Sequence, residues 1–286
     1  MSRQTSTGSW VVAVIVVVAV VGAGAFLARK AMHPDQATAP APATSAAATA
    51  GTVAAPIQHP IAQAQVLPAG ASTAALPALD QSDAEVASAL QQLAGSSPLS
   101  SLLMRPQIIA RIVATIDAMP GRSLGGFMLP ARTPKGAFVT ANVDGNTVIG
   151  AGNAARYAPY MEVIGQVDPQ ALVAWYVRAY PLFQQAYRQL GYPKAYFNDR
   201  LIVVIDNLLA APQLTAPPAL QLSNGYYVYT DPGLESLSAG QRLLLRTGPA
   251  NEAKIKAKLR TIRSLLVGDH LHPAAAATVT ATATSK

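Results

Sequence analysis

The sequence predicts a mainly α-helical protein: one N-terminal transmembrane helix, a disordered Ala/Pro-rich linker, and one compact, predominantly helical domain with a small β-hairpin. An uncharged apolar run lies near the N-terminus, and a long segment without aromatic residues follows it. In the middle of the chain, apolar residues recur with the period of an α-helix. The expected boundaries are 1–9 for a short N-terminal segment, 10–27 for the transmembrane helix, 28–78 for the linker, 79–268 for the domain and 269–286 for a disordered tail.

The transmembrane helix is predicted from Trp10 to Leu27, eighteen residues without a charge. As a helix this run is roughly 27 Å long, close to the hydrocarbon core of about 30 Å. A cleaved signal peptide is the alternative, because Gly22 to Ala25 resemble a cleavage site. We favour an anchor, since the run is longer than the usual signal-peptide core and ends in Arg29 and Lys30. Charges lie on both sides of the run and do not fix its orientation.

The linker and the tail have compositions that do not support a folded core. From Met32 to Ala78 the chain is mostly Ala, Pro, Thr and Gln, with Asp35 as its only acidic residue and no aromatic residue. Such a segment buries too little apolar surface to offset the entropy of ordering it. We expect it to be a disordered tether, and the Ala/Thr-rich end of the chain to be frayed.

The first half of the domain is predicted to hold two helices and a hairpin. Helices are expected from Ser82 or Asp83 to Leu93 and from Pro106 to Ala118, where isoleucines and Val113 form a broad apolar face. Two strand-like runs within 137–149 flank Asp144-Gly145, a strong turn signal.

The second half is predicted to be mostly helical. The clearest helix start is Asp168-Pro169, an N-cap followed by proline in the first turn, and this helix should run to Leu190 with a kink at Pro181. Another should run from Asn198 or Asp199 to Pro212. A short strand is expected at 226–230, with two further helices at 238–247 and 251–267.

Composition excludes several classes of chemistry. The chain has no cysteine, which excludes disulfides, thiolate metal sites and cysteine nucleophiles. All four histidines (His33, His59, His270 and His272) lie in the predicted linker or tail, so the domain lacks the commonest general base and metal ligand. We expect no cofactor and no metal. The net charge of +7 is concentrated between Gly240 and Arg263, and we do not expect nucleic-acid binding.

Several segments of the domain resemble a known family. They read NAARYAPY at 153–160, YPLFQQAYRQLGYPKAYFNDRLIVVIDNLLAAP at 180–212 and YTDPGLESLSAGQRLLLRTGPAN at 229–251, with LPALDQSDAEV and RIVATIDAMP further upstream. The chain resembles the proteobacterial domain of unknown function 3014 family. The resemblance implies a single-span protein of the bacterial inner membrane with its domain in the periplasm. It implies no activity, cofactor or catalytic residue.

Seven tyrosines form the first candidate site, in a chain poor in other aromatics: Tyr157, Tyr160, Tyr176, Tyr180, Tyr187, Tyr192 and Tyr196. Tyrosine pairs an apolar ring with a hydroxyl, so these residues suit either the edge of a core or a groove that grips a peptide or sugar. The predicted contact residues are Arg156, Tyr157, Tyr160, Tyr180 and Arg200.

Asp199 and Asp206 stand two turns apart on one predicted helix. Paired carboxylates support hydrolysis when they face a cleft at a set separation, and salt bridges to Arg156, Arg178 or Arg200 are the structural alternative. The last helix is amphipathic and basic, so its lysines Lys254, Lys256 and Lys258 either contact anionic lipid or lie in solvent.

The favoured hypothesis is a non-catalytic binding or scaffolding domain of the cell envelope, whose partner is an envelope protein or a cell-wall component. The alternative is a carboxylate-dependent hydrolase of envelope polysaccharide that uses Asp199, Asp206 or Asp168. The sequence leaves enzymatic activity open and favours its absence.

Overall fold

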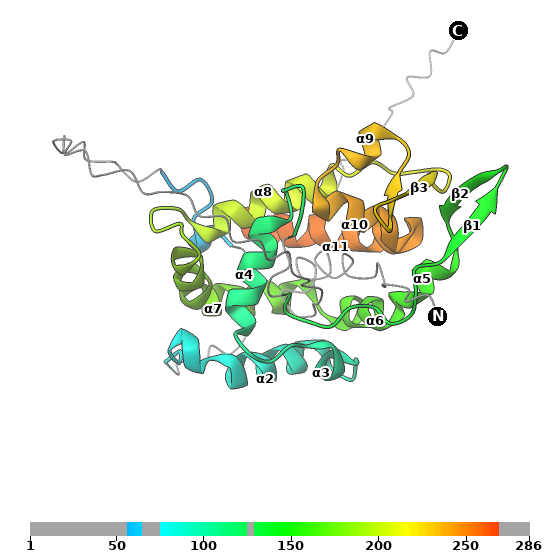
Figure 1. Cartoon of the computed structure of the whole chain (residues 1–286). Helices are drawn as coiled ribbons and strands as arrows, with labels where there is room; N and C mark the ends of the chain where they lie inside the picture. The colour runs from blue at the N-terminus through cyan, green and yellow to red at the C-terminus, as the bar shows by residue number, and fades with distance from the viewer. Residues whose placement is uncertain (1–55, 65–74, 125–128, 269–286) are drawn as a thin grey trace, which may run out of the picture.

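Four helices build the centre of the domain in the computed structural model, which describes residues 56–64, 75–124 and 129–268. They are α4 (Ile108–Ala118), α7 (Pro169–Gln189), α8 (Phe197–Leu209) and α11 (Pro249–Val267). Helices α7 and α8 each contact the other three, as Figure 1 shows. The prediction of a mainly helical domain is confirmed.

The remaining elements surround this centre. Helix α2 (Asp83–Ala94) lies across α4, α6 and α7, and α10 (Ala239–Thr247) covers α8 and α11. The shorter elements are η1 (Ile61–Gln63), η2 (Leu79–Gln81), α3 (Leu99–Leu102), α5 (Gly152–Arg156), α6 (Ala158–Gln166) and α9 (Pro232–Glu235). The 153–160 segment, for which no element was predicted, thus spans two helices.

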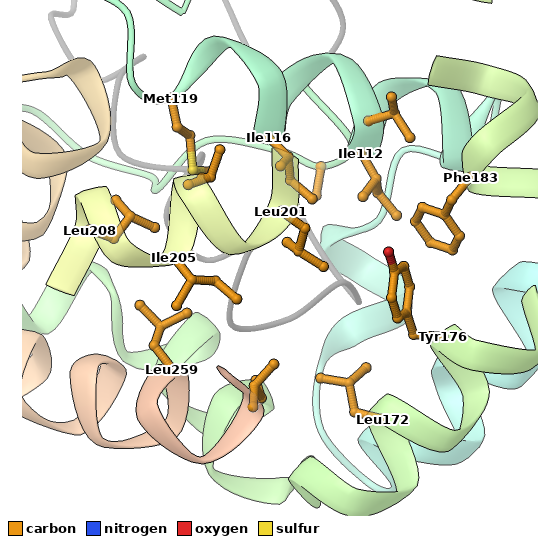
Figure 2. Packing of buried hydrophobic residues seen from close by; sticks show 14 of the residues in the cluster. Ile112, Ile116, Met119, Leu172, Tyr176, Phe183, Leu201, Ile205, Leu208 and Leu259 are labelled. Atoms are coloured by element: carbon orange, nitrogen blue, oxygen red, sulfur yellow. The ribbon is translucent and has the colours of Figure 1, made fainter. Parts of the chain in front are cut away.

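The core lies where α4, α7, α8 and α11 meet. Figure 2 shows Ile112 and Ile116 of α4 facing Leu201 and Ile205 of α8. All four side chains are buried. The apolar period read from the sequence therefore corresponds to the faces that pack together.

Side-chain caps fix where several helices begin. The Asp168 carboxylate accepts the Ala171 N–H at 2.8 Å, with Pro169 in the first turn as predicted. Helix α4 is capped from outside, because the Asp83 carboxylate of α2 accepts the N–H groups of Gln107 and Ile108 at 2.7 and 2.8 Å. Helix α7 continues through Pro181 to Gln189.

Two antiparallel hairpins project beside α10. Strands β1 (Thr140–Val143) and β2 (Asn146–Ile149) are joined by Asp144-Gly145, as predicted. Strands β3 (Leu220–Ser223) and β4 (Tyr226–Tyr229) are joined by Asn224-Gly225. All four turn residues have positive φ, the geometry of the tight hairpin turn that Asn-Gly and Asp-Gly favour.

The second hairpin corrects the prediction of a single small hairpin. Only the second strand of this pair was predicted, at 226–230, although Asn224-Gly225 is itself a hairpin signal. A single bridge between Val148 and Ala219 places the hairpins side by side, and Figure 1 shows them adjacent at one end of the domain.

Residues 56–64 differ from the disordered linker predicted for 28–78. They form the short helix η1 and lie against α7 and α11. Two backbone N–H groups, of Gln58 and His59, bond to the Asp199 carboxylate, and Asn198 donates to the His59 carbonyl at 2.8 Å. These contacts join positions about 140 residues apart, which local composition does not predict.

The predicted transmembrane helix (10–27), the rest of the linker up to residue 55 and the tail (269–286) lie outside the described residues. Among the helices that the structure does describe, none combines the length and hydropathy needed to cross a bilayer.

Candidate functional site

The five predicted contact residues do not converge. Arg156 ends α5, Tyr157 caps the junction with α6 and Tyr160 lies on α6, whereas Tyr180 and Arg200 lie on α7 and α8. Tyr157 is 0% and Tyr160 is 1% exposed, so neither lies on a contact surface as predicted. The Tyr160 hydroxyl donates to the Arg132 carbonyl at 2.6 Å and Tyr157 fills the core, which is the structural alternative for these tyrosines.

Each of the other three predicted contact residues already has partners within the domain. Arg156 donates to the carbonyls of residues 134–136 and to the Asn153 side chain. The Tyr180 hydroxyl donates to the Gln184 side chain at 2.8 Å. Arg200 forms an ion pair with Asp117 at 2.7 Å. These contacts hold loops and helices of the domain together.

The tyrosine-rich region is mainly an aromatic core. Tyr176 lies 5.1 Å from Phe183, edge to face, and Phe183 stacks on Phe197 at 5.7 Å between ring centroids. Tyr187 stacks on Tyr192 at 4.6 Å and shields it on one side. Burial raises the pKa of Tyr187 to about 12, and the nearby Asp117 carboxylate adds to this rise.

The three candidate catalytic carboxylates are occupied by structural contacts. Asp199 accepts the backbone N–H groups of residues 58 and 59, Asp168 caps α7, and Asp206 forms a bidentate pair with Arg263. Asp206 therefore has an arginine partner, although not one of the three considered from the sequence. Asp199 and Asp168 have different structural roles. Asp199 holds the segment around residues 58 and 59, and Asp168 caps the first turn of α7. No observation favours carboxylate hydrolysis.

The basic last helix is less exposed than its sequence suggests. Lys256 is 1% exposed, pairs with Glu252 at 2.7 Å and donates to the Ala211 carbonyl. Lys258 donates to the carbonyls of Ile164 and Val167 at the end of α6, and burial lowers its pKa. Of the three lysines considered for lipid contact, only Lys254 is fully exposed.

A pocket not predicted from the sequence lies between the β3–β4 hairpin and α10. Its volume is 350 Å³, and we call it the Arg246 pocket. Its walls are formed by Ser223, Asn224, Tyr226, Tyr227, Val228, Glu235, Ala239, Arg242, Leu243 and Arg246. This volume is at the lower end of the range for small-molecule sites.

Two rings hold the Arg246 guanidinium at the pocket. Its central carbon lies 5.8 Å from the Phe138 ring and 5.6 Å from the Tyr229 ring, within the range of a cation–π interaction. One terminal nitrogen donates to the Tyr227 carbonyl at 2.8 Å. Burial raises the pKa of Tyr229, and the adjacent positive charge of Arg246 opposes that rise.

The arginines were the available sequence signal for this pocket. Arg242 and Arg246 are four residues apart, so they share a face of α10. The residues that complete the site come from the β3–β4 hairpin, from Glu235 of α9 and from Phe138, which precedes β1, and their position beside α10 depends on long-range packing. No group of three or more His, Asp or Glu residues suited to a metal occurs in the described part of the chain.

Fold and pocket together define a mainly helical domain in which the β3–β4 hairpin and α10 line a cationic pocket. The sequence profile of the family described as "Protein of unknown function (DUF3014)" matches residues 108–263, more than half of the chain, and the chain belongs to this family. The resemblance noted in the sequence is thereby confirmed, and the matched range contains the whole Arg246 pocket. No curated protein and no solved structure matches the chain.

Proposed function

We propose that this protein is a membrane-anchored, non-catalytic binding protein of the bacterial envelope, which binds its partner through the Arg246 pocket. The observation that carries the proposal is a half-buried guanidinium that lines a cavity and has no ion pair with a carboxylate in the described part of the chain. A cation held in this way is suited to a ligand with an acceptor group. The engagement of Asp168, Asp199 and Asp206 in structural contacts supports a binding role over hydrolysis.

The anchor in this proposal is the apolar run from Trp10 to Leu27, which spans the inner membrane, and the domain lies in the periplasm. Full-length protein should stay with the membrane after washing at high salt and high pH, and deletion of 10–27 should release it. Protease added to spheroplasts should digest the domain. Soluble full-length protein, or a mature chain that begins after Ala25, would remove the anchor from the proposal.

The binding role is tested with a photocrosslinking amino acid at Tyr226, whose side chain is 53% exposed at the rim of the pocket. In intact cells this position should give discrete adducts. The same crosslinker at Val203, which is 50% exposed on α8 and does not line the pocket, is the matched control. Adducts from Tyr226 that disappear in Arg246→Lys support the pocket as the binding site. Equal adduct patterns from both positions would contradict it.

A further inference from the structure

The Arg246 pocket contains one positive charge that the protein does not neutralise. Its walls carry two arginines and one acid, and the acid, Glu235, forms an ion pair with Arg242 and accepts the Tyr229 N–H at 2.9 Å. Arg242 also donates to the Arg122 carbonyl at 2.6 Å. The remaining charge is that of Arg246, and it sets the electrostatic character of the cavity.

The guanidinium of Arg246 is positioned before any ligand arrives. The rings of Phe138 and Tyr229 both lie within cation–π distance of it, and the Tyr227 carbonyl accepts one of its hydrogen bonds. Its Nε atom is buried and has no hydrogen-bond partner in the described part of the chain. A planar guanidinium offers its donors in a fork that fits a carboxylate or phosphate, and a fork held in place loses little entropy on binding.

The other walls select the body of a ligand. Tyr226, Tyr227 and Val228 provide apolar surface, while Ser223 and Asn224 provide a polar edge. A ligand that reaches Arg246 therefore also covers aromatic and aliphatic groups. Because only one positive charge is free and Glu235 lies in the same wall, a singly charged anion is favoured over a doubly charged phosphate.

We infer that the Arg246 pocket binds a monocarboxylate with an apolar body, its carboxylate paired with Arg246 and its body against Tyr226 and Val228. This inference rests on the proposed binding role and names the ligand class for that site. Two sources share this chemistry: a free aromatic or aliphatic acid, and the C-terminal residue of a peptide.

The test measures binding of radiolabelled phenylacetate to the full-length protein in lipid nanodiscs by equilibrium dialysis, with empty nanodiscs to correct for partition into lipid. Unlabelled competitors then compare three head groups on the same ring. Phenylacetate should compete at least about 10-fold better than phenylacetamide, because the charged fork-to-carboxylate pair is lost in the amide. Phenyl phosphate should compete less well than phenylacetate.

Matched variants locate the binding event. Arg246→Lys keeps the charge and loses the fork, and it should weaken binding by about 10-fold or more. Arg188→Gln removes one exposed arginine of α7 and should leave affinity unchanged. Tyr226→Ala removes an exposed wall with little effect on folding, and it should weaken binding several-fold even if Arg246→Lys perturbs the hairpins.

The outcomes separate the two proposals. Equal competition by acid and amide, stronger competition by phenyl phosphate, or no binding above empty nanodiscs would overturn the ligand class. If the ligand class is overturned but the crosslinker at Tyr226 still gives adducts that depend on Arg246, the proposed binding role stands. If these adducts are absent as well, the binding role is also rejected. N-acetyl-alanyl-phenylalanine and its C-terminal amide then distinguish the two sources of the carboxylate. If the peptide acid competes better than both its amide and phenylacetate, the pocket binds a carboxylate and the ligand is a peptide C-terminus. If the peptide acid competes less well than phenylacetate, the ligand is a free acid.

Discussion

The carboxylate of Asp199 accepts the backbone N–H of His59 at 2.6 Å, although 140 positions separate the two residues. The same carboxylate accepts a second hydrogen bond, from the Gln58 N–H at 3.1 Å. Asp199 thereby fixes a point at which the chain between the predicted anchor and the domain meets the folded core. This point lies within the 28–78 segment that composition predicts to be a disordered linker.

Asp199→Ala should release this segment. Loss of two charge-assisted hydrogen bonds at a partly exposed site is expected to lower the free energy of unfolding by about 1–2 kcal/mol. Hydrogen exchange of the amides at 57–64 should accelerate, and urea unfolding of the full-length protein gives the stability change. Asp206→Ala is the matched control on the same helix, because its exposed pair with Arg263 should contribute less than about 1 kcal/mol and does not touch the segment. Unchanged exchange in Asp199→Ala would show that the Asn198 hydrogen bond and the apolar contacts of Ile61 hold the segment without Asp199.

Local sequence signals predicted much of the fold because the structure uses them locally. Asp168 caps a helix through a residue three positions away, and Asp144-Gly145 turns a hairpin between adjacent strands. Strand β3 was missed because Leu220–Ser223 is short and mostly exposed, and only its pairing with β4 makes it a strand. Residues 57–64 were missed because their hydrogen bonds come from α8.

The candidate site was not predicted, for a related reason. Tyrosine density indicated an aromatic cluster, but it did not separate buried rings such as Tyr157 from rim residues such as Tyr226. The Arg246 pocket needs Phe138, which precedes β1, and Tyr229 of β4 to meet at Arg246 of α10. Such a meeting depends on how distant segments pack, which neither periodicity nor composition reports.

Gly240 permits the close approach of α10 to the centre of the domain. A Cβ atom at this position would lie 2.6 Å from the Leu208 side chain and 3.3 Å from Met119. Gly240→Ala should therefore lower the unfolding free energy by about 1–3 kcal/mol through overpacking. Gly165 of α6 has open space around its position, so Gly165→Ala should raise stability by about 0.5–1 kcal/mol through helix propensity. Urea titration measures the unfolding free energy of both variants. A Gly240→Ala protein as stable as the unmodified protein would mean that α10 moves to accommodate the methyl group without a loss of stability.

Lys256 and Glu252 form a buried ion pair, 1% and 3% exposed, on the inner face of α11. Lys256→Gln leaves the Glu252 carboxylate buried without its cation and should cost about 3–5 kcal/mol. Lys254→Gln, an exposed neighbour on the same helix, should change stability by less than about 0.5 kcal/mol. The double variant Glu252→Gln/Lys256→Met should recover most of the loss, because it removes both charges. A double variant no more stable than Lys256→Gln would contradict this account of the pair.

Tyr157 and Tyr160 are both buried, but their hydroxyl groups differ. The Tyr157 hydroxyl has no hydrogen-bond partner in the described part of the chain, whereas that of Tyr160 donates to the Arg132 carbonyl at 2.6 Å. Tyr157→Phe should therefore be neutral or stabilising, because it removes an unsatisfied polar group. Tyr160→Phe should cost about 1 kcal/mol. Thermal and urea unfolding compare the two, and a larger loss from Tyr157→Phe would indicate that its hydroxyl is satisfied in solution.

Buried tyrosines should also make the domain sensitive to alkaline pH. Burial raises the pKa of Tyr187 to about 12, against about 10 in an unfolded chain. The folded state thus favours the neutral ring, and the resulting stabilisation is complete below about pH 10 and is lost as pH rises towards 12. Unfolding free energy measured in urea should fall across this interval, together with the appearance of tyrosinate absorbance. Tyr187→Phe cannot ionise and should make the decline shallower than in the unmodified protein; an unchanged slope would assign the alkaline transition to other groups.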